Sequence, residues 1–154
     1  MKALLLSAGF GSRLKPLTLK TPKCLIKIEQ KPLLQYWLDF LFISGIEKVL
    51  INTHHLSSQV EEFLLKSVYK NKIVISYEKN LLGTGGTLLQ NKTFFDNEDF
   101  IVAHSDNLCI CNFKDFIESH LERPVGTLMT MMTFLTNTPK SCGIVELDKK
   151  KIVR

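Results

Sequence analysis

The chain has 154 residues, of which 45% are hydrophobic and 23% are charged, and these values are close to those of ordinary globular domains. This length predicts one domain with a full hydrophobic core, and the composition excludes collagen-like, low-complexity and disordered chains. The net charge of +5 is concentrated near the N-terminus, because residues 1–31 hold seven basic residues and one acidic residue. A basic segment wound around glycines favours a small anion over nucleic acid as its partner. A solvated basic surface is the alternative interpretation.

No segment of the sequence reaches the ~20 apolar residues that a membrane span requires, so no membrane partner is expected. The apolar stretch 33–43 is interrupted by Gln35 and Asp39. The apolar run after Lys2 is too short for a signal peptide. The cysteines are too few for a disulfide framework at this length, which favours reduced thiols and a cytoplasmic location; they are Cys24, Cys109, Cys111 and Cys142.

Apolar runs of strand length alternate with helical patterns over most of the chain, which is typical of an α/β fold. Near-continuous apolar runs predict parallel strands buried on both faces, at residues 3–6, 48–51, 73–77 and 100–104. Right-handed crossovers between them predict a Rossmann-like, doubly wound, mostly parallel sheet with helices on both faces.

Helices are predicted over residues 32–44, from a capping box at Ser58 and Glu61, near Thr84, and over residues 112–120. Gly45 is placed to end the first helix. The first two helices should each bury one apolar face, formed by Leu34, Trp37, Leu38 and Leu41 and by Val60, Phe63, Leu64 and Val68.

The last third of the chain changes character. Residues 127–135 and 143–147 predict two further strands, with a turn at 148–150 and a short strand at 152–153. The side chains of Met129, Met131 and Met132 are expected to fill the core. A strand that begins so close to the C-terminus cannot pair over a useful length, so we expect residues 1–154 to be a single domain truncated at its C-terminus. An unfinished sheet edge can also promote association into a homo-oligomer.

A loop with two glycines follows the first predicted strand, at the edge of the sheet where open α/β folds bind ligands. Gly9 and Gly11 allow backbone N–H groups to approach phosphate oxygens. Arg13 can grip two oxygens, and Lys23 supplies a compact positive charge. The loop does not fit the dinucleotide fingerprint, because Leu14 stands where a third glycine belongs. The glycine-rich segment 83–87 does not fit a P-loop either, because no lysine follows its glycines.

The full string around this loop is far more specific than two glycines. It comprises Ala8, Gly9, Gly11, Ser12, Arg13, Leu14, Pro16, Leu17, Thr18, Pro22 and Lys23. This string resembles the signature of the sugar-1-phosphate nucleotidyltransferases. The likeness continues at residues 52–55, 78–86, 106–107 and 141–146, and so covers essentially the whole chain. It implies a sheet of the nucleotide-diphospho-sugar transferase type.

The resemblance also implies a reaction and roles for residues. A sugar 1-phosphate would attack the α-phosphorus of a nucleoside triphosphate, and pyrophosphate would leave. Arg13 and Lys23 would be catalytic: Arg13 would hold the β- and γ-phosphates, and Lys23 would neutralise the α-phosphate and the attacking phosphate. Asp106 would ligate Mg²⁺, the implied cofactor, although Ser105 precedes it where the family usually has glycine. The nucleotide-binding residues would be Ala8, Gly9, Gly11, Ser12, Gly83 and Thr84, the last two along the base and ribose.

Several alternatives stay open. Residues 83–86 and 141–146 look most like mannose-1-phosphate guanylyltransferases, which favours GTP with mannose or heptose 1-phosphate. Uridylyl or thymidylyl transfer to a glucose-type 1-phosphate is the nearest alternative, and a non-catalytic nucleotide-binding fragment is another. Lys23 could be an exposed surface lysine and Asp106 a turn residue.

Two further groups of residues could suggest chemistry. His104, Cys109 and Cys111 lack the second paired set that a metal site of this kind needs, so buried reduced thiols are expected. His54 and His55 end a predicted strand, and a structural or substrate-edge role is expected for them rather than general-base catalysis.

Overall fold

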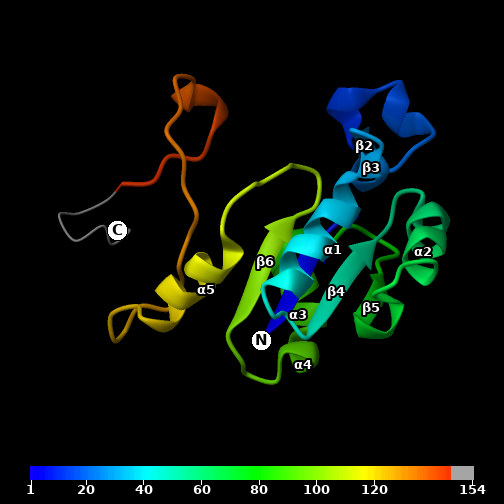
Figure 1. Cartoon of the computed structure of the whole chain (residues 1–154). Coiled ribbons are helices and arrows are strands. Elements are labelled where there is room, and N and C mark those ends of the chain that lie inside the picture. Colours follow the sequence, from blue (N-terminus) through cyan, green and yellow to red (C-terminus); the bar gives the residue numbers. More distant parts are fainter. Residues whose placement is uncertain (147–154) are drawn as a thin grey trace. The chain divides into compact units, whose positions relative to one another are not determined.

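The computed structural model describes residues 1–146 (Figure 1). Its centre is a four-stranded parallel sheet with the strand order β5-β4-β1-β6. All four strands that the apolar runs predicted are present, with ends within two residues of the predicted ones, and the α/β class is confirmed. The strands are β1 (Lys2–Leu6), β4 (Lys48–Thr53), β5 (Ile73–Tyr77) and β6 (Phe100–His104).

The two central strands carry most of the core because they have a neighbouring strand on each side and helices above and below. Leu4 of β1 pairs with Leu50 of β4, and Leu5 pairs with Ile51. All four side chains are at most 1% exposed. Successive side chains of a strand point to opposite faces, so the buried middle parts of β1 and β4, residues 3–5 and 49–51, are apolar on both faces, which explains why they do not alternate.

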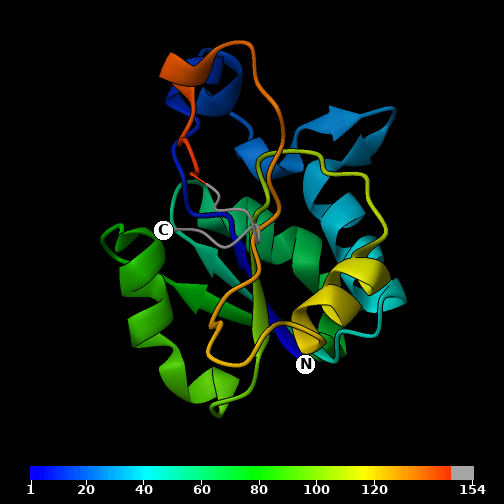
Figure 2. The ribbon, with the colours of Figure 1, turned by 90° about the vertical axis from the view of Figure 1, so that its left-hand side faces the viewer.

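The helices cover both faces of the sheet, as predicted. The crossovers from β1 to β4 and from β4 to β5 step in one direction, and the crossover from β5 to β6 steps back across the sheet. Right-handed crossovers therefore place α1 and α2 on one face and α3 and α4 on the other. Figure 2 shows α1 (cyan) and the α3–α4 pair (green) on opposite sides of the sheet. The helices are α1 (Leu33–Ile43), α2 (Ser57–Leu65), α3 (Gly83–Gln90), α4 (Lys92–Phe95) and α5 (Phe113–Leu121).

The first predicted helix is confirmed together with its buried face. Leu34, Leu38 and Leu41 are fully buried at helical spacing, and Trp37 between them is also buried. Gly45 follows the helix with φ +90°, a left-handed conformation in which glycine has no Cβ to clash.

The second helix exists, but two details of its prediction are wrong. The N-cap of the helix is Leu56 rather than Ser58, and no side chain accepts from the free N–H groups of the first turn. Ser58 cannot do so because it lies inside that turn itself. Val68 is 88% exposed because the helix ends at Leu65, so helical spacing no longer places Val68 on the buried face.

The chain divides into two compact units, Met1–Phe116 and the residues from Ile117 onward. In the second unit, the strand prediction is wrong for residues 127–135 and for 143–146, none of which lies in a strand. A strand needs a partner for its backbone N–H and C=O groups, and backbone bonds in this region close turns instead, as from Thr127 N to Pro124 O. The predicted turn at 148–150 and strand at 152–153 lie outside the described residues.

The predicted burial of the methionines is also wrong. Met129, Met131 and Met132 are between 42% and 63% exposed. Without a paired strand around them, their side chains have no sheet face against which to pack.

Three short 3₁₀ helices and a small hairpin between β1 and α1 were not predicted. They are η1 (Ser12–Leu14), η2 (Leu17–Leu19), η3 (Lys23–Leu25), and the antiparallel pair β2 (Lys27–Ile28) and β3 (Lys31–Pro32). Within residues 1–146, the helices are too short or too polar to cross a membrane.

Candidate functional site

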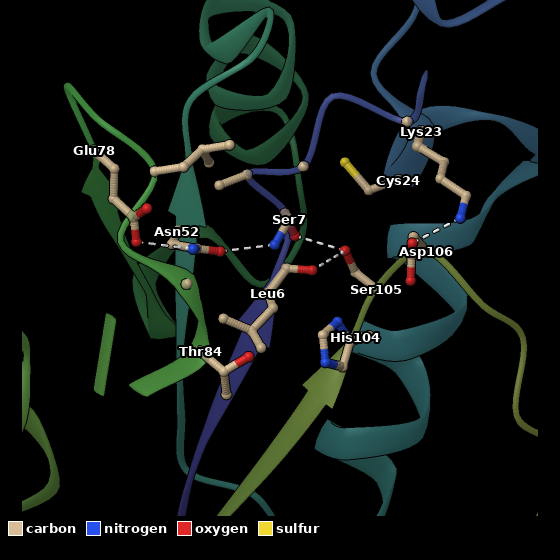
Figure 3. Close-up of a pocket in the computed structure, with 15 residues that line it drawn as sticks. Leu6, Ser7, Lys23, Cys24, Asn52, Glu78, Thr84, His104, Ser105 and Asp106 are labelled. Atoms are coloured by element: carbon tan, nitrogen blue, oxygen red, sulfur yellow. Dashed lines mark hydrogen bonds and ion pairs between the residues drawn. The ribbon is translucent and has the colours of Figure 1, made fainter. Parts of the chain in front are cut away.

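A cavity of about 240 Å³ lies at the carboxyl ends of β1, β4 and β6 (Figure 3). Three parts of the first unit form most of its lining: the loop after β1, the start of α3, and the turn after β6. Of the nine predicted site residues, seven line it: Ala8, Gly9, Gly11, Lys23, Gly83, Thr84 and Asp106. The topology therefore brings together residues that are far apart in the sequence, at the edge where open α/β sheets bind ligands.

The loop after β1 depends on glycine at position 11. Gly11 has φ +62°, and a Cβ atom there would stand 2.8 Å from Thr18 Cγ2. Thr18 is 1% exposed, and its hydroxyl donates to the Gly11 carbonyl at 2.9 Å. Gly11 therefore folds the loop tightly onto η2. Around Gly9, by contrast, a Cβ would meet no atom within 4 Å, which leaves space for a ligand beside the backbone.

Lys23 and Asp106 form an ion pair beside this loop. Lys23 Nζ lies 2.6 Å from Asp106 Oδ2, and the two side chains are 29% and 42% exposed. Lys23 begins η3, and Asp106 lies in the turn that follows β6. The sequence placed both residues at the site without predicting that they contact each other. Because both side chains remain partly open to solvent, a phosphate or a cation can compete for either of them.

Ser12 and Arg13 lie elsewhere in the loop. Both are exposed in η1, and neither lines the cavity. Their predicted roles in nucleotide binding and catalysis stay predictions.

A buried polar network that the sequence analysis did not identify forms another part of the lining, through Ser7, Asn52 and Glu78. The Asn52 amide links Ser7 N, at 2.7 Å, to Glu78 Oε1, at 2.9 Å. The Thr87 hydroxyl donates to the same Glu78 oxygen at 2.5 Å. Asn52 and Glu78 are only 3% and 2% exposed. A signal was present in the sequence: a polar residue, Asn52, continues an otherwise apolar strand toward its carboxyl end.

A second buried contact ties the end of β1 to the turn that carries Asp106. The Ser105 hydroxyl donates to Leu6 O at 2.9 Å. Since a hydroxyl has one hydrogen, the 2.7 Å contact between Ser7 and Ser105 is donated by Ser7. Ser105 is fully buried, so the serine that stands where the resemblance led us to expect glycine holds this turn in place.

The cysteines differ in environment. Burial raises the pKa of the Cys24 thiol to about 12, which keeps it neutral beside the cavity. Cys109 and Cys111 lie in the loop after β6, where no strand forms. Cys109 is half-buried and Cys111 is exposed, so the predicted burial is wrong for both. Partial desolvation and the neighbouring Cys109 raise the pKa of the Cys111 thiol to about 11. Residues 1–146 contain no cluster of three or more His, Cys, Asp or Glu side chains that could hold a metal.

The two histidines after β4 have structural partners. His54 Nδ1 lies 2.8 Å from Glu78 O, and His55 Nε2 lies 2.8 Å from Thr18 O. A carbonyl oxygen only accepts, so each ring donates an N–H to the backbone. The Phe10 ring packs against both imidazoles. These contacts favour the predicted structural role over that of a general base.

Comparison with known proteins places the chain among nucleotidyltransferases. Residues 2–154 match the family model described as Nucleotidyl transferase. The mannose-1-phosphate guanylyltransferase catalytic subunit beta of Drosophila melanogaster is 32% identical over 157 residues, which cover 99% of this chain and 42% of that protein. The Danio rerio subunit is 34% identical over 160 residues, which cover 100% of this chain and 44% of that protein. The chain thus spans less than half the length of these relatives.

Solved structures agree on the fold. HddC from Yersinia pseudotuberculosis is 29% identical with a TM-score of 0.69, over 79% of this chain and 54% of that chain. HddC has also been solved in complex with GMP-PN. UDP-glucose pyrophosphorylase in complex with UDP-glucose is 26% identical with a TM-score of 0.67, over 79% of this chain and 53% of that chain. These likenesses confirm the predicted fold type, and the family match spans nearly every residue. The chain belongs to the nucleotidyl transferase family.

Proposed function

We propose that this chain is the nucleotide-binding part of an enzyme that transfers a nucleoside monophosphate from GTP to mannose 1-phosphate or heptose 1-phosphate. The products are pyrophosphate and a nucleotide sugar. One observation carries the proposal: a single cavity is lined by the Gly9–Gly11 loop, by the Lys23–Asp106 pair and by the first residues of α3, Gly83 and Thr84. The loop and the charged pair suit a triphosphate, and the start of α3 suits the base and ribose.

The chemistry asks the protein for positioning and positive charge more than for covalent catalysis. A sugar 1-phosphate is already an anion at neutral pH, so its attack on the α-phosphorus needs no general base. Two polyanions must approach each other, and Lys23 supplies a preorganised cation at the cavity wall. In the resting site Asp106 holds the Lys23 ammonium, and phosphate oxygens would take over this contact. Arg13 would bind the β- and γ-phosphates in the same proposal.

Mg²⁺ is the cofactor of the proposed reaction, and Asp106 is its protein ligand. The residues present fit this ion, because Mg²⁺ is usually held by one or two carboxylates together with substrate phosphates and waters. The Asp106 carboxylate lines the cavity and is 42% exposed, so one of its oxygens can face a ligand. When bound, the ion would neutralise charge on the phosphates.

The choice of GTP is supported by the named activity of the relatives and by the HddC complex with GMP-PN. Transfer from UTP or dTTP to a glucose-type 1-phosphate is the second candidate, supported by the likeness to UDP-glucose pyrophosphorylase. A fragment that binds nucleotide without turning it over is the third, since the chain spans 42–44% of its curated relatives. A cytoplasmic location completes the proposal, supported by four free thiols.

The test is a matrix of pyrophosphate-release assays with Mg²⁺, in which GTP, UTP, dTTP, ATP and CTP are each combined with mannose, heptose and glucose 1-phosphates. We expect the highest kcat/KM with GTP. Calorimetric titration of each triphosphate into the chain separates the third candidate, because a fragment would bind nucleotide and release no pyrophosphate. A chain that binds no triphosphate would contradict the proposal.

A further inference from the structure

The buried network of Ser7, Asn52, Glu78 and Thr87, of which the first three line the cavity, joins two segments that the proposed reaction must hold at a fixed separation. Asn52 lies near the end of β4, between β1 and β5. Ser7, which it holds, directly precedes the Ala8–Gly11 part of the loop. Glu78, its other partner, holds Leu82 N at 3.1 Å, and Leu82 directly precedes Gly83 and Thr84. A single amide side chain therefore stands between the two walls of the cavity (Figure 3).

The hydrogen-bonding capacity of the groups fixes the orientation of this amide. Ser7 N–H can only donate, so Asn52 Oδ1 must face it, and Nδ2 then faces the Glu78 carboxylate. The hydroxyl of Thr87 donates its one hydrogen to Glu78 at 2.5 Å, so it accepts from Asn52 Nδ2 at 3.3 Å. Both amide hydrogens, the amide oxygen and the hydroxyl are thus satisfied, and flipping the amide would oppose two donors at Ser7.

Ser7 has special need of this acceptor. β1 ends at Leu6, and the strand ladder does not continue past it, so the Ser7 N–H requires a side-chain partner. Glu78 has a matching need, because a carboxylate that is 2% exposed must be surrounded by donors. Asn52 meets both needs at once, which neither an apolar residue nor a carboxylate could do.

We propose that Asn52 is a positioning residue, which sets the separation of the phosphate-side loop and the base-side start of α3 through its paired bonds to Ser7 and Glu78. This inference rests on the proposed function, because it assumes that one nucleotide touches both walls. Substrate geometry in enzymes is sensitive to shifts below 1 Å, so loss of the link should change nucleotide affinity as well as stability.

The experiment exchanges the amide of Asn52 and the carboxylate of Glu78 between the two positions. In Asn52→Asp two carboxylates face each other. In Glu78→Gln the new amide must turn its NH₂ group toward either Asn52 Nδ2 or Leu82 N–H, so that donor meets donor. In the double variant Asn52→Asp with Glu78→Gln, every donor again has an acceptor. The amide at position 78 then donates to the carboxylate at position 52 and accepts from Leu82 N–H, while that carboxylate still accepts from Ser7 N–H.

The probe is whichever of GTP, UTP and dTTP binds the wild-type chain most tightly. It is titrated at a temperature well below the thermal unfolding midpoint of each variant. We expect each single variant to weaken nucleotide binding by roughly tenfold or more, the scale of one unsatisfied buried group. The double variant should return to within about threefold of the wild type, since the coupling of contacting residues makes their effects non-additive.

A second measurement and a control variant accompany the titration. Amide hydrogen exchange at Ser7 and Leu82 should accelerate in the single variants and slow again in the double variant. Asn91→Ala is the matched control: it removes an asparagine bond to Thr87 O at the far end of α3 and should leave binding unchanged.

Each outcome decides between the two claims. Single variants that bind nucleotide as tightly as the wild type, whatever their stability, overturn the positioning role and leave the proposed function standing. Weak single variants whose double variant is not restored also overturn it, because direct contact with the ligand would then account for the loss. A wild-type chain that binds none of the triphosphates overturns the proposed function and this inference with it.

Discussion

The cavity has two kinds of polar residue, and they differ in how far their bonding capacity is used. Lys23 and Asp106 at the cavity wall are 29% and 42% exposed and have each other as partner. Asn52 and Glu78 also line the cavity, but they and Thr87 are at most 3% exposed and have several partners each. A buried charge must be saturated to be tolerated, whereas a half-exposed charge can exchange partners. The first pair is therefore suited to contact a ligand, and the second set to hold the loop after β1 and the start of α3 through Ser7 and Leu82.

This comparison predicts that changes at the wall alter function with little effect on stability. The largest effect is expected for Lys23→Ala, which should lower kcat by about 10²-fold or more, the scale of losing one preorganised electrostatic contact. The free energy of unfolding should change little, because an ion pair this exposed contributes at most about 1 kcal/mol. Pyrophosphate release and chemical denaturation measure the two quantities.

Lys20→Ala is the control for this variant, since Lys20 is an exposed lysine of the same basic segment. Equal turnover in the two variants would remove Lys23 from the mechanism.

The two glycines of the loop after β1 should differ in how well they tolerate a side chain. Gly11→Ala must adopt φ +62° and meet Thr18 at 2.8 Å, so it should destabilise the fold by up to about 3 kcal/mol. Gly9→Ala faces open space and should leave the unfolding midpoint in urea nearly unchanged. Similar midpoints for the two variants would show that neither the positive φ of Gly11 nor its contact with Thr18 constrains the loop.

Thr87→Val tests the buried network of Asn52, Glu78 and Thr87 with a change that keeps the shape of the side chain. It removes the donor to Glu78 and the acceptor for Asn52, and should lower the free energy of unfolding by about 1–2 kcal/mol. Thr93→Val changes an exposed threonine of α4 and should stay within about 0.5 kcal/mol of the wild type. Denaturation curves for both variants decide, and no difference between them would mean that Glu78 is satisfied without Thr87.

Asp106→Asn tests the carboxylate at the cavity wall as a ligand for Mg²⁺. It removes a negative oxygen that Mg²⁺ prefers and keeps the size of the side chain, so the Mg²⁺ concentration for half-maximal activity should rise by about tenfold, an effect of about 1.4 kcal/mol. An unaltered metal titration would assign Asp106 to the turn alone.

The buried thiol of Cys24 should make the free energy of unfolding depend on pH. Burial raises the pKa of this thiol from 9.0 to about 12, so the neutral form is favoured in the folded state. Its contribution to stability is complete below pH 9 and is lost as the pH rises toward 12, by about 1 kcal/mol between pH 9 and pH 10. Cys24→Ala should lose stability less steeply over this range in urea denaturation at a series of pH values, and equal slopes would contradict the buried neutral thiol.

The fold and the site were predictable to different extents. The four strands and α1 were found from apolar spacing alone, but the predicted burial on both faces is wrong for the edge strands: β5 has no buried residue and β6 has one, Ile101. The capping box predicted at Ser58 is wrong because the helix begins two residues earlier than the local motif indicates, after the N-cap Leu56. The strands expected over residues 127–135 and 143–146 failed because β-forming composition states a preference, and only a neighbouring backbone can satisfy it.

The sequence by itself determined where the four strands of the sheet and α1 lie along the chain, together with the glycine loop and the family signature around Arg13 and Lys23, because these depend on residues close together in the chain. Only the tertiary structure decided that Lys23 meets Asp106, 83 residues away, and that Asn52 links Ser7 to Glu78. Such partners are chosen by strand order and register, which bring distant residues to one edge of the sheet, where the cost of burying a polar group requires each to find its complement.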